Sequence, residues 1–161
     1  MQKVVLVIHD VRSIHNVGSL FRTADGLGVS KIYLTGYTPA PVDRFGRNVS
    51  AFSKVSLGAE ETVPWEKKEI HELIHELKTN HFDVVALEQA PSAIPLDEYV
   101  SQKSVALILG NEVEGIPHTI LDEVDAVVEI PMKGKKESLN VSNAGAIALY
   151  HLSNTNNSAH Q

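Results

Sequence analysis

The sequence predicts an α/β fold with a mainly parallel sheet flanked by helices, and three observations lead to it. Several apolar runs are continuous, such as residues 3–9 and 104–109, which is typical of strands buried on both faces of a parallel sheet. Segments with apolar residues at helical spacing alternate with these runs. The first strand, helix and strand fit within about 35 residues, as a βαβ unit does.

The first half of the chain predicts a strand, a helix, a second strand and a long connection. Apolar residues recur at helical spacing over residues 16–27, and Gly28 ends this helix as a natural C-cap. Residues 31–35 supply the next strand. The stretch 36–58 contains prolines and basic residues without a regular period, which predicts a loop with one short helix.

The second half predicts three more strands and three more helices. Residues 65–78 are strongly charged but carry an apolar stripe, so they are expected to form an amphipathic helix. A short helix is expected over 118–122 and a final one over 140–152. Three apolar runs predict the remaining strands, over residues 82–87, 104–109 and 126–130.

Length and composition indicate one domain, over residues 1–153, followed by a polar tail over 154–161 that we expect to be disordered. No apolar run is long enough for a membrane span, and no leader precedes the first strand, so a cytoplasmic location is expected. Cysteine is absent, which excludes disulfides and thiolate metal sites. The net charge of −6 argues against a uniformly basic nucleic-acid coat but permits a local basic face.

The segment 137–150 contains more hydrogen-bonding side chains than a helix start requires. Two serines and two asparagines occupy positions between 138 and 143, whereas one such residue is enough to cap a helix. The surplus indicates a ligand at the helix start, where free N–H groups and the positive end of the dipole point. An overcapped helix without a ligand is the alternative. A strand end and a basic, glycine-containing loop, residues 130–136, lead into this segment.

Two other motifs follow predicted strands. Residues 16–24 include Arg22, for which an exposed side chain with its stem packed on the surface is an equally good interpretation. Residues 109–116 place Gly110 and Gly115 around an acidic loop, which suits close ligand approach or an ordinary turn. Ligands bind at the carboxyl ends of parallel strands, so the three motifs could meet there. The glycine fingerprint of dinucleotide sites and the lysine of a Walker loop are missing.

Together these motifs resemble those of the SpoU (TrmH) family of RNA ribose 2′-O-methyltransferases, within the SPOUT superfamily. They stand in family order at residues 16–24, at 109–115, and at 130–132 followed by 138–142, and the resemblance covers residues 4–152. It implies an α/β fold whose C-terminal segment forms a deep trefoil knot, a feature that chains otherwise avoid. It also implies S-adenosylmethionine as cofactor, no metal, and a homodimer whose two subunits contribute to each active site.

The resemblance also assigns residues. The implied cofactor-binding residues are Leu87, Glu88, Gly110, Asn111, Gly115, Ile130, Met132, Ser138 and Leu139. The implied catalytic residues are Asn16, Arg22, Glu112, Ser138 and Asn140. In the family the arginine matching Arg22 is proposed to deprotonate the ribose hydroxyl, with the asparagine matching Asn16 orienting it. Because a guanidinium stays protonated in proteins, we favour Arg22 as a clamp on the target phosphate that also stabilises developing alkoxide charge.

The expected function is methylation of a ribose 2′-hydroxyl in structured RNA, with tRNA slightly favoured over rRNA. The alternative is a noncatalytic RNA-binding protein that retains the fold; the missing glycine fingerprint argues against a nicotinamide-dependent oxidoreductase. Without an RNA-binding extension, the core itself must recognise RNA. The basic residues that flank the motifs are the expected phosphate contacts, although each alone could be a solvated surface charge: Arg12, Arg44, Arg47, Lys54, Lys133, Lys135 and Lys136.

Overall fold

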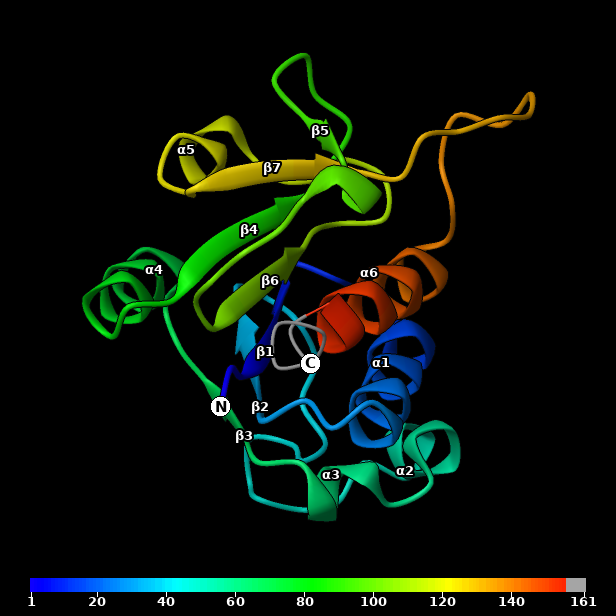
Figure 1. Ribbon diagram of the computed structural model, residues 1–161. Helices are drawn as coiled ribbons and strands as arrows, with labels where there is room; N and C mark the ends of the chain where they lie inside the picture. Colours follow the sequence, from blue (N-terminus) through cyan, green and yellow to red (C-terminus); the bar gives the residue numbers. More distant parts are fainter. Residues whose placement is uncertain (156–161) are drawn as a thin grey trace.

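The computed structural model describes residues 1–155 of the chain, and in them a seven-stranded sheet forms the centre of the fold (Figure 1). The strand order is β3-β2-β1-β6-β4-β7-β5, and every neighbouring pair is parallel. The strands are β1 (Val4–His9), β2 (Lys31–Thr35), β3 (Trp65–Lys67), β4 (Asp83–Leu87), β5 (Ile94–Pro95), β6 (Val105–Leu109) and β7 (Ala126–Glu129).

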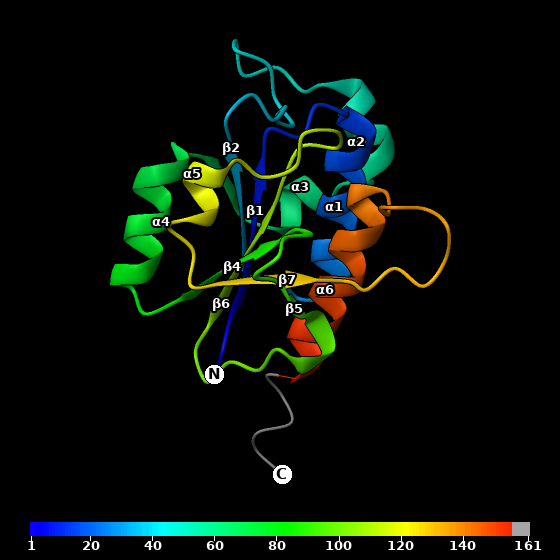
Figure 2. The same cartoon turned by 90° about the horizontal axis from the view of Figure 1, so that it is seen from above.

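Helices cover both faces of the sheet (Figures 1 and 2). The α-helices are α1 (Ile14–Gly26), α2 (Ser50–Ser56), α3 (Ala59–Thr62), α4 (Ile70–Thr79), α5 (His118–Leu121) and α6 (Val141–Thr155), and a 3-10 helix η1 spans Leu96–Glu98. Helices α1, α2, α3 and α6 lie on one face, and α4 and α5 lie on the other.

The central strands are buried on both faces, which explains their continuous apolar runs. In β1, Leu6 and Ile8 belong to the core shared with α1 and α6, whereas Val5 and Val7 belong to the core under α4 and α5. Successive side chains of a strand point to opposite faces, so both sets must be apolar when helices cover both faces. The predicted α/β class with a mainly parallel sheet is therefore confirmed.

The predicted helix over residues 65–78 is wrong in its first part. Trp65–Lys67 forms strand β3, and Trp65 pairs with Ile32 of β2. The helix begins at Ile70, after Glu69, whose carboxylate accepts a hydrogen bond from the backbone N–H of Glu72 as an N-cap. The apolar stripe of the predicted helix, Ile70, Leu73, Ile74 and Leu77, lies entirely within α4, so residues 65–67 are free to pair at the sheet edge.

The remaining differences are small. The stretch 36–58 contains one short helix, α2, as predicted, whereas α3, β5 and the 3-10 helix were not predicted. Helix α6 extends two residues past the predicted domain end at 153, to Thr155. The rest of the predicted tail lies outside the described residues.

Helix α6 approaches α1 and β6 closely because Gly145 has no side chain. A Cβ atom at this position would lie 2.7 Å from Leu109 Cδ1 and 2.7 Å from Leu20 Cδ2, which is shorter than carbon atoms tolerate. This contact fixes the start of α6 next to the carboxyl end of β6.

Candidate active site

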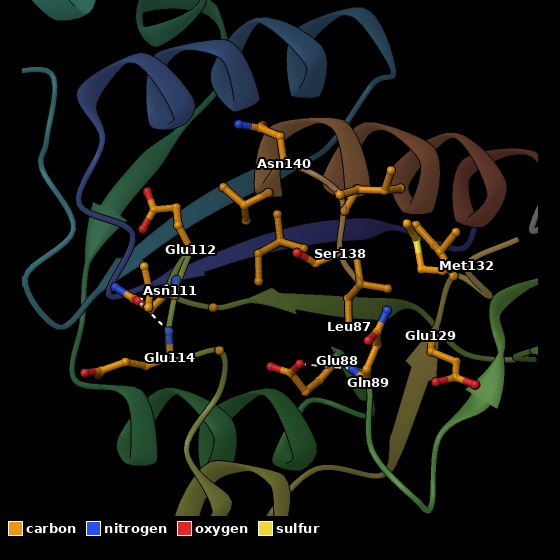
Figure 3. A pocket seen from close by; sticks show the side chains of 18 residues that line it. Leu87, Glu88, Gln89, Asn111, Glu112, Glu114, Glu129, Met132, Ser138 and Asn140 are labelled. Atoms are coloured by element: carbon orange, nitrogen blue, oxygen red, sulfur yellow. Dashed lines mark hydrogen bonds between the residues drawn. The ribbon is translucent and has the colours of Figure 1, made fainter. Parts of the chain in front are cut away.

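A pocket of about 460 Å³ lies at the carboxyl ends of β4, β6 and β7, beside the start of α6 (Figure 3). Asn111 and Glu112 lie at one end of the pocket, and Glu129 and Met132 lie at the opposite end. The lining residues are Leu87, Glu88, Gln89, Leu109, Gly110, Asn111, Glu112, Val113, Glu114, Gly115, Glu129, Ile130, Met132, Ser138, Leu139, Asn140, Val141 and Ala144.

All nine residues assigned to the cofactor line this pocket, and so do Glu112, Ser138 and Asn140 of the catalytic set. Asn16 lies behind the lining and contacts two lining residues, Glu112 and Asn140. Arg22 lies apart from the others. The fold therefore brings together segments that are up to 124 residues apart in the sequence.

The Glu112 carboxylate joins the loop after β6 to the start of α1. The backbone N–H groups of Arg12 and Ser13 donate to it at 3.3 and 3.1 Å, and the Asn16 side-chain amide donates at 3.3 Å. Burial acts to raise the pKa of Glu112, but hydrogen bonds from its own backbone N–H and from Ser13, Arg12 and Asn16 outweigh it, and the pKa is lowered. Glu112 is thus held ionised and serves as an acceptor, not as a proton donor, at neutral pH.

Asn140 caps α6 and also connects that helix to α1. Its side-chain oxygen accepts from the backbone N–H and the hydroxyl of Ser142, at 2.9 and 2.6 Å. Its side-chain NH₂ donates to the side-chain oxygen of Asn16 at 3.3 Å. The helix-cap interpretation is therefore correct for Asn140, and its second hydrogen bond makes it part of the chain Asn140–Asn16–Glu112.

The loop after β6 has a backbone path that only glycine permits at two points. A Cβ on Gly110 would lie 2.8 Å from the backbone carbon of Gly115, and Gly115 itself has a φ of +70°. The Glu88 carboxylate accepts from the backbone N–H of Ile116 at 2.8 Å and would lie 2.2 Å from a Cβ on Gly115. The two glycines thus allow the loop to fold back against β4 and frame the pocket.

Asn111 anchors the same loop to the segments that follow β1 and β2. Its side-chain NH₂ donates to the backbone carbonyl of Asp10 and to the Tyr37 hydroxyl, both at 2.9 Å. Its side-chain oxygen accepts from the backbone N–H groups of Val113 and Glu114 at 2.9 Å. The contact between Asn111 and Tyr37 could not be predicted from the sequence, because the two residues are 74 positions apart and share no local motif.

Arg22 is exposed on α1 and does not line the pocket of its own chain. Arg22 lies six positions after Asn16, which corresponds to a rotation of about 240° around an α-helix. Asn16 is buried and faces Glu112 and Asn140, so Arg22 projects from a different side of α1. Within residues 1–155, the side-chain hydrogen bonds of Asn16 do not include Arg22.

The pocket has seven lining residues that the sequence interpretation did not include. Five of them lie next to predicted residues at strand ends or in the loop after β6, and two lie one and four residues after Asn140. They are Gln89, Leu109, Val113, Glu114 and Glu129, followed by Val141 and Ala144. Strand ends and helical spacing would have indicated most of them.

All seven basic residues expected to contact phosphate are exposed, from Arg12 to Lys136.

Among the described residues, no group of three or more His, Asp or Glu side chains could hold a metal ion. No helix in residues 1–155 has the length and apolarity needed to cross a membrane.

Fold and pocket define a class, that of α/β proteins with a pocket at the carboxyl ends of a parallel sheet, which is where ligands bind in such folds. The sequence model of the SpoU rRNA Methylase family matches residues 3–150, nearly all of the chain. The chain therefore belongs to the SpoU rRNA methylase family.

Three comparisons with known proteins agree with this assignment. The chain is 32% identical over 148 residues to 23S rRNA (guanosine(2553)-2′-O)-methyltransferase RlmP of Bacillus subtilis, covering 92% of this chain and 57% of that protein. The crystal structure of an AdoMet-bound rRNA methyltransferase from Sinorhizobium meliloti superimposes with a TM-score of 0.85 at 27% identity, over 92% of this chain and 55% of that one. The TrmH/SpoU tRNA modifying enzyme of A. aeolicus has a TM-score of 0.85 at 26% identity, covering 99% and 78%.

The chain thus spans little more than half the length of the curated relatives that it matches. The shared part contains the sheet, the pocket and the three motifs, because the family match extends from residue 3 to residue 150.

Proposed function

We propose that this protein transfers a methyl group from S-adenosylmethionine to a ribose 2′-hydroxyl of RNA. The observation that carries the proposal is the chemistry of the pocket in a chain of the SpoU rRNA methylase family. Four glutamates, Glu88, Glu112, Glu114 and Glu129, are among its eighteen lining residues, and no lysine or arginine is. Such a pocket favours a cationic sulfonium and disfavours the pyrophosphate of a dinucleotide.

The shape of the pocket suits the rest of the cofactor. Apolar side chains from three segments, including Leu87, Leu109 and Leu139, offer surfaces for a flat adenine ring. The loop that begins at Gly110 brings main-chain N–H and C=O groups to the same pocket, and glycine permits a close approach there. We assign the nine predicted cofactor-binding residues, from Leu87 to Leu139, to binding S-adenosylmethionine.

S-adenosylmethionine supplies a methyl group bound to a sulfonium: as O2′ attacks the methyl carbon, the S–CH₃ bond breaks, the O–CH₃ bond forms, and S-adenosylhomocysteine and a proton leave. The chain has to position O2′ and stabilise the charge that develops on it. We assign the electrostatic part to Arg22, which stays protonated and binds the adjacent phosphate. We assign Ser138 and Asn140 to the part of the pocket that receives the target nucleotide of the RNA. Asn16 holds Asn140 in place by a hydrogen bond, and Glu112 in turn holds Asn16.

The position of Arg22 supports a homodimer with shared active sites. Its side of α1 faces away from the pocket of its own chain, whereas the exposed apolar side chains Ile147 and Tyr150 of α6 offer a surface for a second copy. In this arrangement Arg22 of one subunit reaches the pocket of the other. We also propose that the segment between β7 and α6 forms the trefoil knot that the family resemblance implies. This segment loops outward from the sheet and returns to the start of α6 (Figure 1), and residues at both of its ends line the pocket.

Methyl transfer to RNA tests the proposal. Purified protein is incubated with labelled S-adenosylmethionine and either total tRNA or rRNA, and the label in RNA is counted. We expect incorporation into one of the two pools, with tRNA slightly favoured, and a rise in melting temperature with the cofactor alone. A chain that binds RNA but shows neither effect would be the noncatalytic RNA-binding protein instead.

A further inference from the structure

A short hairpin, residues 42–48, presents an aromatic ring that belongs to neither hydrophobic core. Phe45 is 66% exposed, and the buried clusters of the described residues do not include it. The guanidinium groups of Arg44 and Arg47 lie 4.7 and 4.9 Å from the centre of its ring. An exposed aromatic ring flanked by two arginines is the combination that proteins use to stack against unpaired bases.

The hairpin holds this ring in a defined position. Val42 and Asn48 form an antiparallel bridge, and the backbone N–H of Gly46 donates to the Asp43 carbonyl at 3.0 Å, which closes a turn with Phe45 at its tip. The Asp43 carboxylate accepts from the N–H groups of Phe45 and Arg47 at 2.8 and 3.0 Å. The backbone hydrogen bond from Arg47 is the largest cause that lowers the pKa of Asp43. The ring is thus displayed by an ordered turn.

The segment that leads into the hairpin is connected to the pocket through Tyr37. The Tyr37 ring is half exposed, its hydroxyl accepts from the Asn111 side chain at 2.9 Å, and Asn111 lines the pocket. The Arg12 guanidinium lies 5.4 Å from the centre of the Tyr37 ring, and the backbone N–H of Arg12 donates to Glu112. A strand that leaves the pocket past Asn111 therefore meets Arg12 and Tyr37, and the segment that contains Tyr37 continues along the chain into the hairpin at Val42.

The charge of this region suits a polyanion. Residues 36–58 contain three basic residues and one acidic residue, a local charge of +2 in a chain whose net charge is −6. The single acidic side chain, Asp43, is occupied by its hydrogen bonds within the turn and by an ion pair with Arg47 at 2.9 Å. Arg44 and Arg12 remain available for phosphate groups.

We propose that the hairpin surface, formed by Arg12, Tyr37, Arg44, Phe45 and Arg47, binds an unpaired RNA segment next to the nucleotide in the pocket, with one base stacked on Phe45. The proposal rests on the RNA-methylating function above and specifies its substrate further. A duplex buries the faces of its bases, so this surface selects a loop or single strand over a continuous helix.

Fluorescence anisotropy tests the hairpin surface without relying on catalysis. The full chain is titrated against a labelled oligouridine of about 15 nucleotides and against the same strand annealed to its complement. Phe45→Ala keeps the charge and removes the ring, so we expect about 5- to 150-fold weaker binding of the single strand with an unchanged salt dependence. Phe45→Tyr should restore binding. Arg44→Gln should reduce the salt slope by about one.

Val100→Ala is the matched control, because Val100 is 69% exposed but lies outside the hairpin. It should bind as the wild type does. Wild-type affinity in Phe45→Ala, or a wild-type chain that binds the duplex as tightly as the single strand, would overturn the proposal. The melting temperature with S-adenosylmethionine is recorded for each variant. If S-adenosylmethionine does not raise the melting temperature of the wild type, the methyltransferase function is refuted instead. The two failures are therefore distinguishable.

Discussion

At the scale of single residues, Glu112 holds two parts of the site together through three hydrogen bonds to the start of α1. Its lowered pKa links these bonds to pH, because a carboxyl with a lowered folded-state pKa stabilises the fold above its unfolded-state pKa. This stabilisation is lost as the pH falls through the folded-state pKa.

Glu112→Gln should therefore lower the free energy of unfolding by about 1 kcal/mol at neutral pH, the low value reflecting the partial exposure of the carboxylate. The difference from the wild type should shrink as the pH falls below about 4.3, where carboxyls in the unfolded chain take up protons. Urea unfolding at a series of pH values measures it. Glu114→Gln, in the same loop, is the control, and a difference that grows on acidification would contradict this role of Glu112.

In the proposed mechanism, Arg22 stabilises the charge that develops on O2′. Arg22→Ala should reduce methyl transfer about a hundredfold or more, as expected for the loss of a charge that acts mainly in the transition state. The melting-temperature shift with S-adenosylmethionine should persist, because the proposed mechanism assigns Arg22 to the RNA phosphate and the developing charge on O2′, and not to the cofactor. Lys67→Ala, a second exposed cation placed on edge strand β3, serves as control. Wild-type turnover in Arg22→Ala would remove this residue from the mechanism.

At the scale of elements, the loop after β6 depends on Gly110. Gly110→Ala would place a methyl group 2.5 Å from Ile116 Cγ1 and against the backbone of Gly115, so the loop must move. We expect a loss of about 1–3 kcal/mol in the free energy of unfolding and a loss of the cofactor-induced melting shift. Gly26→Ala has open space around the new methyl group and should leave both unchanged or slightly raise stability. Equal behaviour of the two variants would show that the loop tolerates a side chain.

The sequence predicts those helices and strands whose hydrophobic pattern is visible within the element itself. Double-buried strands β1, β4 and β6 show as apolar runs, and α1 and α6 show as apolar residues at helical spacing. Strand β3 was assigned to a helix because its pairing with β2 is a tertiary contact that no local period reveals. The hydrogen bond from Asn111 to Tyr37 and the hairpin around Phe45 depend on how distant loops meet, so they too required the structure.

At the scale of the whole molecule, shared active sites allow a complementation test. Arg22→Ala and Gly110→Ala should each be inactive, for different reasons. In a mixed dimer, the Gly110→Ala chain offers an intact Arg22 to the intact pocket of its partner. Unfolding and refolding an equal mixture should restore about one quarter of wild-type methyl transfer, since half of the dimers are mixed and each has one complete site. A mixture as inactive as its components would place Arg22 and the pocket in the same chain.

The most direct test of the central claim is the chemical identity of the methylated nucleoside. RNA treated with the protein and isotopically labelled S-adenosylmethionine is hydrolysed in alkali and analysed by mass spectrometry. Alkaline cleavage needs a free 2′-hydroxyl, so ribose methylation leaves a labelled dinucleotide that resists cleavage. We predict such a dinucleotide, with the label on the ribose. Label on a base, with complete cleavage to mononucleotides, or RNA without label would contradict the assignment.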